Sequence, residues 1–197
     1  LKHHRFTETE DDHDLGLSAP FPITKKSFLR KILRDVTGIT GFRRYSQALL
    51  SILKTHGNST HDRLKGVWFK IHGFIITNIL IFIAISIAFH WSFYFLLWWL
   101  PAFTYYSLII RIRNIAEHCV TSGSTDLDNT RTTLTNPFVR FLMAPHRVNY
   151  HLEHHLFLMC PWYNLPKAHM MMIENGYKDK MCINHSYRSV LYKAVSA

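Results

Sequence analysis

The distribution of apolar and charged positions along the chain is uneven. Residues 71–110 contain no Asp, Glu, Lys or Arg, so all 23 basic and 13 acidic side chains lie elsewhere in the 197-residue sequence. A helix needs about 20 apolar residues to cross a hydrocarbon core of about 30 Å. The run therefore predicts two membrane-spanning helices, Ile71–Phe89 and Trp91–Ile110, paired as a transmembrane helical hairpin with a tight turn at His90. A buried hairpin in a large soluble protein is the alternative, but the rest of the chain has no comparable apolar mass to cover both helices.

The charges that flank the hairpin predict its orientation. Lys65 and Lys70 precede it, Arg111 and Arg113 follow it, and the turn carries no charge. Cytoplasmic loops have an excess of Lys and Arg, so both flanks are expected in the cytosol, where unpaired cysteines also persist. We expect an integral membrane protein of the bacterial inner membrane, or of the endoplasmic reticulum in a eukaryote, with its histidine-rich segments cytosolic.

A third apolar pattern precedes the hairpin. In Thr24–Val36, apolar residues recur at i, i+3 and i+4, and the basic residues Arg30, Lys31 and Arg34 fall on the opposite face. This is typical of a helix that lies in the membrane interface and is attracted to anionic lipid. An ordinary amphipathic helix on a protein core has the same pattern. We expect the net charge of +10 to attract anionic lipid and an acidic protein partner, and we expect no nucleic-acid partner.

A histidine triplet carries the strongest candidate chemistry. His151, His154 and His155 stand at i, i+3 and i+4 within the segment YHLEHHL. On a helix, residues at this spacing are neighbours on one face, about 5–6 Å apart at Cβ. Three imidazoles so placed can surround a metal ion, although a solvent-exposed histidine triplet would have the same spacing.

Two further segments add candidate ligands. Asn114 and His118 lie four residues apart on the expected cytosolic continuation of the second span. The chain begins with Leu1-Lys2-His3-His4, and one histidine before Leu1 would complete a pattern H-x-x-H-H. We therefore expect the sequence to be a fragment that lacks an N-terminal part.

The composition of these clusters limits the choice of metal. They contain no cysteine, which disfavours an iron–sulfur cluster, and the sequence has no H-E-x-x-H zinc protease motif. Imidazole suits Zn, Cu, Fe and Ni, and six histidines exceed the need of one tetrahedral ion, which suggests two metals. Glu117 and Glu153 beside the ligands are either acceptors that fix imidazole tautomers or plain surface carboxylates, and the sequence leaves both open. Arg131 in NTRTT is expected to order a loop near the site, and His169 is assigned to packing.

The combination of motifs resembles a known family. LKHH at the start of the chain, NIAEH at 114–118 and HLEHH at 151–155, around a short membrane hairpin, are similar to the histidine boxes of membrane fatty acid desaturases. The longer segments RNIAEHC, NTRTT, RVNYHLEHH and YNLPKAH resemble a bacterial branch that includes rhizobitoxine-type desaturases. The resemblance covers nearly the whole chain, and the combination is specific although each box alone is weak.

The resemblance implies a fold and a ligand set. The fold is an all-α membrane protein, a partial desaturase fold in which a cytosolic helical cap carries the histidine boxes. A single truncated domain would contain residues 1–70 with part of the second box, the hairpin at 71–110, and the cap at 111–197. Two non-haem irons would be bound by residues that match the family's motifs, which are His3, His4, Asn114, His118, His151, His154 and His155. The first histidine box and first hairpin of the family, which precede the second box, have no counterpart, so we expect this fragment to be inactive alone.

The expected reaction is desaturation of a fatty acyl chain or related lipid. An alkyl C–H bond offers no acidic proton or leaving group, so its cleavage calls for a metal centre that activates O2. The sequence shows no flavin or haem motif, so electrons would come from an external donor such as a ferredoxin or cytochrome b5, whose acidic surface the basic chain could help to dock. A di-iron hydroxylase or ketolase acting on a lipid or carotenoid would use nearly the same ligands. A membrane metal-binding or transport protein is disfavoured, because transporters usually place ionisable ligands inside the spans.

Overall fold

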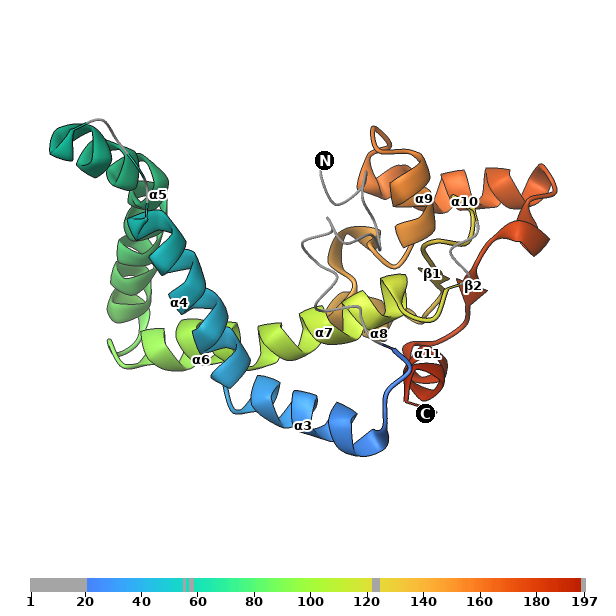
Figure 1. Cartoon of the computed structure of the whole chain (residues 1–197), viewed down its shortest axis with the longest axis horizontal. Helices are drawn as coiled ribbons and strands as arrows, with labels where there is room; N and C mark the ends of the chain where they lie inside the picture. Colours follow the sequence, from blue (N-terminus) through green and yellow to red (C-terminus); the bar gives the residue numbers. More distant parts are fainter. Residues whose placement is uncertain (1–20, 55, 57–58, 122–124, 196–197) are drawn as a thin grey trace. The chain divides into compact units, whose positions relative to one another are not determined.

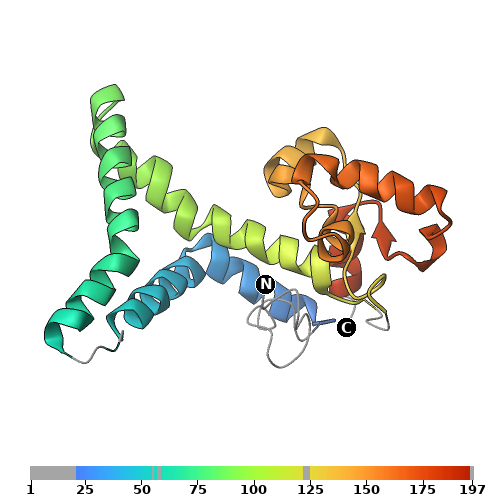
Figure 2. The ribbon, with the colours of Figure 1, turned by 90° about the horizontal axis from the view of Figure 1, so that it is seen from above.

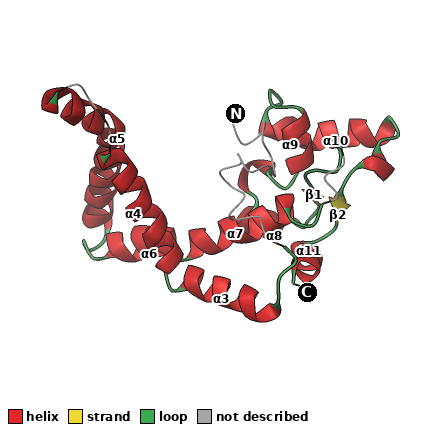
Figure 3. Ribbon diagram, in the orientation of Figure 1, coloured by secondary structure: helices red, strands yellow, loops and turns green. Residues whose placement is uncertain are grey.

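The structure is a computed structural model, and it describes residues 21–54, 56, 59–121 and 125–195 (Figure 1). These residues are mostly helical, as expected, and β1 (Thr132–Thr133) and β2 (Ile183–Asn184) are the only strands among them (Figure 3). The chain divides into two compact units. One contains the described residues up to Arg30 together with those from Ile109 onwards, and the other contains Lys31–Leu108. The borders fall within two helices, α3 (Lys25–Val36) and α7 (Tyr105–His118).

The unit at 31–108 contains the apolar helices. Its elements between α3 and α7 are α4 (Ile39–Leu53), α5 (Thr60–Ala88), a π-helical turn η1 (Phe95–Trp99) and α6 (Leu100–Phe103). Ser59 caps α5, because its hydroxyl oxygen accepts a hydrogen bond from the backbone N–H of Asp62 at 3.1 Å. The chain leaves helical geometry between Ala88 and Phe93, where the sequence predicts a turn.

Two helices in the described part of the chain are long and apolar enough to cross a membrane. Helix α5 has 29 residues and a mean hydropathy of 2.2 in its most apolar window, none of which is buried inside the protein. The second is the 24-residue run Phe95–His118, with a mean hydropathy of 1.3. Helix α5 begins before the predicted boundary at Ile71 because the cap at Ser59, and not the start of the apolar stretch, determines where the helix starts.

The side-chain amide of Asn78 in α5 uses both its donor and its acceptor groups in hydrogen bonds. The Asn78 amide donates to the carbonyl oxygen of Phe74 at 2.8 Å. Its Oδ1 accepts from the hydroxyl of Tyr94 at 2.7 Å and from the indole N–H of Trp98 at 3.1 Å. A polar group in a hydrocarbon environment is tolerated only with such partners, so this group joins α5 to the segment that follows it.

Helix α3 matches the amphipathic segment predicted at Thr24–Val36. Leu29 and Leu33 on its apolar face are more than half exposed, at 58% and 52%. Phe28, in contrast, packs against the core of the unit that contains the C-terminal half of the chain. The helix therefore presents apolar side chains outward, as an interfacial helix requires.

The other unit gathers the C-terminal elements around the end of α7 (Figure 2). These are β1, α8 (Pro137–Met143), the 3-10 turn η2 (Pro145–Arg147), α9 (His151–Leu156), η3 (Trp162–Asn164), α10 (Leu165–Glu174), η4 (Lys178–Lys180), β2 and α11 (Tyr187–Ala194). The buried core joins Ile115 and Ala116 of α7 and Cys119, which follows it, to Ala144 and to Tyr187, Val190 and Ala194 of α11. A smaller core forms around Leu152, Met172 and Met181.

A short parallel ladder fixes the position of α9. Thr132 pairs with Ile183 and Thr133 pairs with Asn184. The backbone N–H of Thr133 also donates to the carbonyl oxygen of Asn149 at 2.8 Å, and Thr132 forms an antiparallel bridge with Tyr150. These bonds hold the residues immediately before α9 against a buried strand, and Leu152 anchors the helix from the other side.

Candidate metal centre

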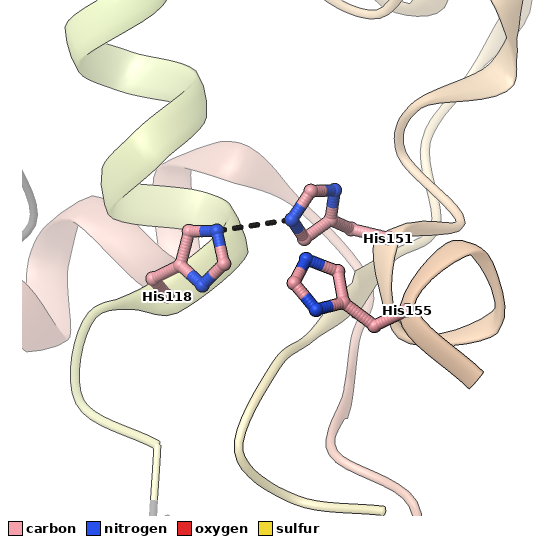
Figure 4. Close-up of side chains that lie close together, drawn as sticks. All are labelled: His118, His151 and His155. Atoms are coloured by element: carbon pink, nitrogen blue, oxygen red, sulfur yellow. Dashed lines mark hydrogen bonds between the residues drawn. The ribbon is translucent and has the colours of Figure 1, made fainter. Parts of the chain in front are cut away.

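Three histidines from two helices converge in the C-terminal unit. His118 is the last residue of α7, and His151 and His155 lie one turn apart on α9. One ring nitrogen of each lies within 4.8 Å of the other two. Figure 4 shows the rings facing one another, with Nε2 of His118 and Nε2 of His151 3.0 Å apart. The ring centroids are separated by 4.5 to 5.5 Å.

Burial keeps the central imidazole of this group neutral. The pKa of His151 is lowered well below its usual 6.5, first because burial disfavours the charged ring and then because of the nearby His118, His155 and His154. The positive charge of Arg113 acts in the same direction. A neutral ring retains the lone pair that a metal ligand needs, so His151 is in its binding-competent protonation state at neutral pH.

The donor set fits a transition metal. Imidazole nitrogens suit Zn, Cu, Fe and Ni, whereas Mg and Ca prefer oxygen ligands. The Nδ1 atom of His151 is buried and has no hydrogen-bond partner within the described residues. The carboxylate oxygen Oε2 of Glu117 lies 3.9 Å from it, which is beyond hydrogen-bond distance. A metal ion that accepts imidazole lone pairs would compensate this buried donor set.

The structure brings together some of the predicted ligands. His118, His151 and His155 form the group, and His154 is half-buried beside it. Asn114 is half-buried on α7, four residues before His118. The ring of His154 lies 5.9 Å from that of His151 and 6.0 Å from that of His155, measured between centroids. The predicted ligands at positions 3 and 4 lie outside the described residues.

Glu117 and Glu153 are both buried, so neither is a plain surface carboxylate. Arg113 Nε donates to Glu117 Oε1 at 3.1 Å, a contact one turn apart on α7 that fixes the orientation of this carboxylate next to His118. Glu153, which is fully buried, accepts a hydrogen bond from His169 Nδ1 at 2.5 Å and another from the hydroxyl of Thr132. The tautomer that Glu153 fixes is therefore that of His169 and not that of a ligand candidate.

The sequence assigns His169 to packing, and the structure buries it, but its hydrogen bond to Glu153 was not predicted. His169 lies sixteen residues after Glu153 on a different helix, α10, so no local spacing signals the contact. Glu153 lies between His151 and His155 on α9, and its two hydrogen bonds, from Thr132 of β1 and from His169 of α10, tie α9 to both elements. His169 therefore acts on the histidine group only through the position of α9.

Arg131 orders the loop that follows His118, as predicted. Its guanidinium is buried and donates to the carbonyl oxygens of Ala116 at 3.2 Å, Cys119 at 2.8 Å and Val120 at 2.9 Å. These carbonyls end α7 and have no helical partner of their own. A cation at this position also interacts favourably with the negative end of the helix dipole, so Arg131 stabilises the helix end that presents His118.

Comparison with known protein families gives one finding. A family model described as fatty acid desaturase matches residues 1–187. Neither the curated proteins nor the solved structures give a match.

Proposed function

The chain is a member of the fatty acid desaturase family, and from this membership we propose that it catalyses the O2-dependent desaturation of a fatty acyl chain or a related lipid. The reaction converts an adjacent pair of CH2 groups into a CH=CH unit. One O2 molecule, two electrons from a donor and two protons are consumed, and two water molecules are formed. The substrate thus loses two hydrogen atoms, and both oxygen atoms leave as water.

The observation that carries the proposal is the group of His118, His151 and His155 in a chain of this family. Their ring nitrogens are within 4.8 Å of one another, and the donor set is that of a transition-metal site. We propose that the chain binds two irons, which supply the activation of O2 when bound. The proposed ligands are these three residues together with His3, His4, Asn114 and His154.

The remaining residues of the site hold the ligands in place. Burial keeps His151 neutral and able to bind metal. Arg131 fixes the end of α7 beside His118, and Glu153 with His169 fixes α9. The protein thus supplies a preorganised set of imidazoles, and the proposal assigns no proton transfer to a side chain.

The membrane arrangement follows from the two apolar helices. We propose that α5 and the run Phe95–His118 pair as a transmembrane hairpin with both flanks in the cytosol, because Lys65, Lys70, Arg111 and Arg113 flank an uncharged turn. A cytosolic site has access to a soluble electron donor such as a ferredoxin, or to cytochrome b5. The lipid substrate would reach it from the bilayer.

Iron content tests the proposed metal. The chain is purified in detergent with the variants His155→Ala and His185→Ala, and iron and zinc are measured by mass spectrometry. His185 is an exposed histidine of the same unit, so its variant is the matched control. We expect iron in the wild type and in His185→Ala and a clear loss in His155→Ala. Tight zinc in place of iron would favour a metal-binding or transport protein instead.

Product analysis tests the reaction. Because this chain alone is expected to be inactive, lipids are extracted from cells that express the whole natural gene that encodes it, and their masses are compared with those from the His155→Ala strain. A product that is lighter by two hydrogen atoms and depends on O2 supports desaturation. A product that is heavier by one oxygen atom would identify a hydroxylase or ketolase, and unchanged lipids in an iron-loaded wild type would refute both.

A further inference from the structure

A pocket outside the histidine group lies between α8 and η3. Its volume is about 530 Å³, and the side chains that determine its chemistry are Arg140, Phe141, His146, Arg147 and Trp162. None of these residues belongs to the group of His118, His151 and His155. The pocket is therefore a separate feature of the same unit.

The described residues that line this pocket carry positive charge and no carboxylate. Arg140 and Arg147 both line it, and neither side chain forms an ion pair or a hydrogen bond with another residue that the structure describes. His146 adds an imidazole, whose ring makes an edge contact with Trp162 at 5.3 Å between centroids. Two guanidiniums and an imidazole around one hollow are a donor set for an anion with several oxygens, because guanidinium groups bind phosphate oxygens in bidentate fashion.

The backbone at the pocket is held in an unusual conformation. His146 and Arg147 both have φ of +54°, a left-handed conformation that residues other than glycine rarely adopt. Consecutive residues in this region are strained, and such strain is typical of ligand-binding sites. Both strained residues are among those that line the pocket, which indicates that the turn after α8 is shaped to present them.

Aromatic side chains border the basic pocket. Phe141 is 80% exposed and Trp162 is 49% exposed, although aromatic rings of this size are usually buried. A fully polar anion would gain nothing from them, whereas a phosphate attached to apolar chains would bury these rings together with its own apolar part. A flat acidic protein surface fits less well, because the cations lie in a concave pocket.

We propose that this pocket binds a phosphate group, and that the occupant is a phosphate monoester or diester carried by a lipid headgroup. The guanidiniums of Arg140 and Arg147 bind the phosphate oxygens, and Phe141 and Trp162 contact the adjoining apolar part. Binding requires neither iron nor turnover, so its test is independent of the desaturase assay.

The test measures binding to the metal-free full chain in a non-ionic detergent. Dihexanoyl phosphatidic acid, inorganic phosphate and dihexanoylglycerol are titrated separately and followed by isothermal calorimetry. The pocket variant is Arg140→Gln/Arg147→Gln. The matched control is Arg188→Gln/Lys193→Gln, which removes the same two charges from exposed positions of α11.

We expect the phosphatidic acid to bind the wild type and the control equally and the pocket variant at least roughly tenfold more weakly, because two charge-assisted contacts are lost. Dihexanoylglycerol should not bind measurably. If inorganic phosphate binds as tightly as the lipid and with the same dependence on the variants, the site takes phosphate but the assignment to a lipid is overturned.

Other outcomes contradict the proposal as a whole. Equal weakening in the pocket variant and the control would show a general charge effect. An unchanged phosphatidic acid affinity with a loss of binding to an acidic ferredoxin would assign the pocket to a protein partner. If the double variant does not fold, the single variant Arg140→Gln replaces it, because Arg140 lies within α8 and outside the strained turn. An unchanged lipid affinity of Arg140→Gln would equally refute the proposal.

Discussion

Replacement of His169 by alanine should destabilise the unit that carries the histidine group. Glu153 is fully buried, and His169 Nδ1 donates to its carboxylate at 2.5 Å while Thr132 supplies the second bond. Removal of one partner leaves a buried carboxylate with half of its hydrogen bonds. Leaving a buried acceptor without one of its hydrogen-bond partners typically costs about 1–3 kcal/mol, because the group keeps its desolvation penalty.

A double-mutant cycle separates this cost from simple loss of packing. The cycle comprises Glu153→Leu, His169→Leu and Glu153→Leu/His169→Leu. The double variant replaces both polar partners with apolar groups, so it should be less destabilising than His169→Leu alone. The coupling between the two sites should be about 1–3 kcal/mol, as for residues in direct contact. Thr132→Val should cost about 1.5–3 kcal/mol, the loss of one hydrogen bond to a charged group.

Thermal unfolding of the detergent-solubilised chain, followed by tryptophan fluorescence at neutral pH, measures these differences. For a chain of this size about 1 kcal/mol corresponds to roughly 2–4 °C in Tm, so His169→Ala should lower Tm by at least about 2 °C. His185→Ala, which changes an exposed histidine, should leave Tm unchanged. Iron content should fall together with Tm, because α9 carries His151 and His155. Additive single variants, or a loss below about 1 kcal/mol in His169→Ala, would refute the reasoning.

Three further predictions concern other parts of the molecule. The pKa of His151 is lowered below 6.5, so its neutral ring stabilises the fold above that pH, and this contribution is lost as pH falls towards the folded-state pKa. Iron content measured after dialysis should therefore be constant from about pH 8 to 6.5 and fall at lower pH. Iron loss that begins above about pH 7 would contradict this. Arg131→Gln should lower the free energy of unfolding, measured by thermal unfolding, by about 2–3 kcal/mol. Arg131→Lys should lower it nearly as much, because a lysine ammonium lacks the planar fork that reaches three carbonyl oxygens. Full stability in the lysine variant would show that charge alone matters. Asn78→Leu should cost about 1 kcal/mol in detergent-induced unfolding because Tyr94 and Trp98 lose their shared acceptor, and an effect above about 3 kcal/mol would mean that Asn78 has a role beyond this contact.

Local patterns in the sequence predicted the features that depend on neighbouring residues. The uncharged run at 71–110 predicts two apolar helices because hydropathy is summed over consecutive residues, and the amphipathic segment matches α3 almost to the residue. The spacing of His151 and His155 predicts their proximity because residues four apart on a helix differ by only about 40° around its axis. His154 lies about 60° from His151 and about 100° from His155 around the axis, so its ring borders the group, 5.9 Å from the ring of His151 between centroids.

Contacts across long stretches of sequence were decided only by the tertiary structure. His118 precedes His151 by 33 residues, and the two rings meet because the β1–β2 ladder and the core around Ile115 and Leu152 dock α9 beside the end of α7. The bond between Glu153 and His169 and the pocket at Arg140 and Arg147 likewise depend on how separate elements pack. Helix periodicity determines which side chains share a face, whereas the burial of apolar surface between elements determines which faces meet, and no short stretch of sequence contains that second kind of information.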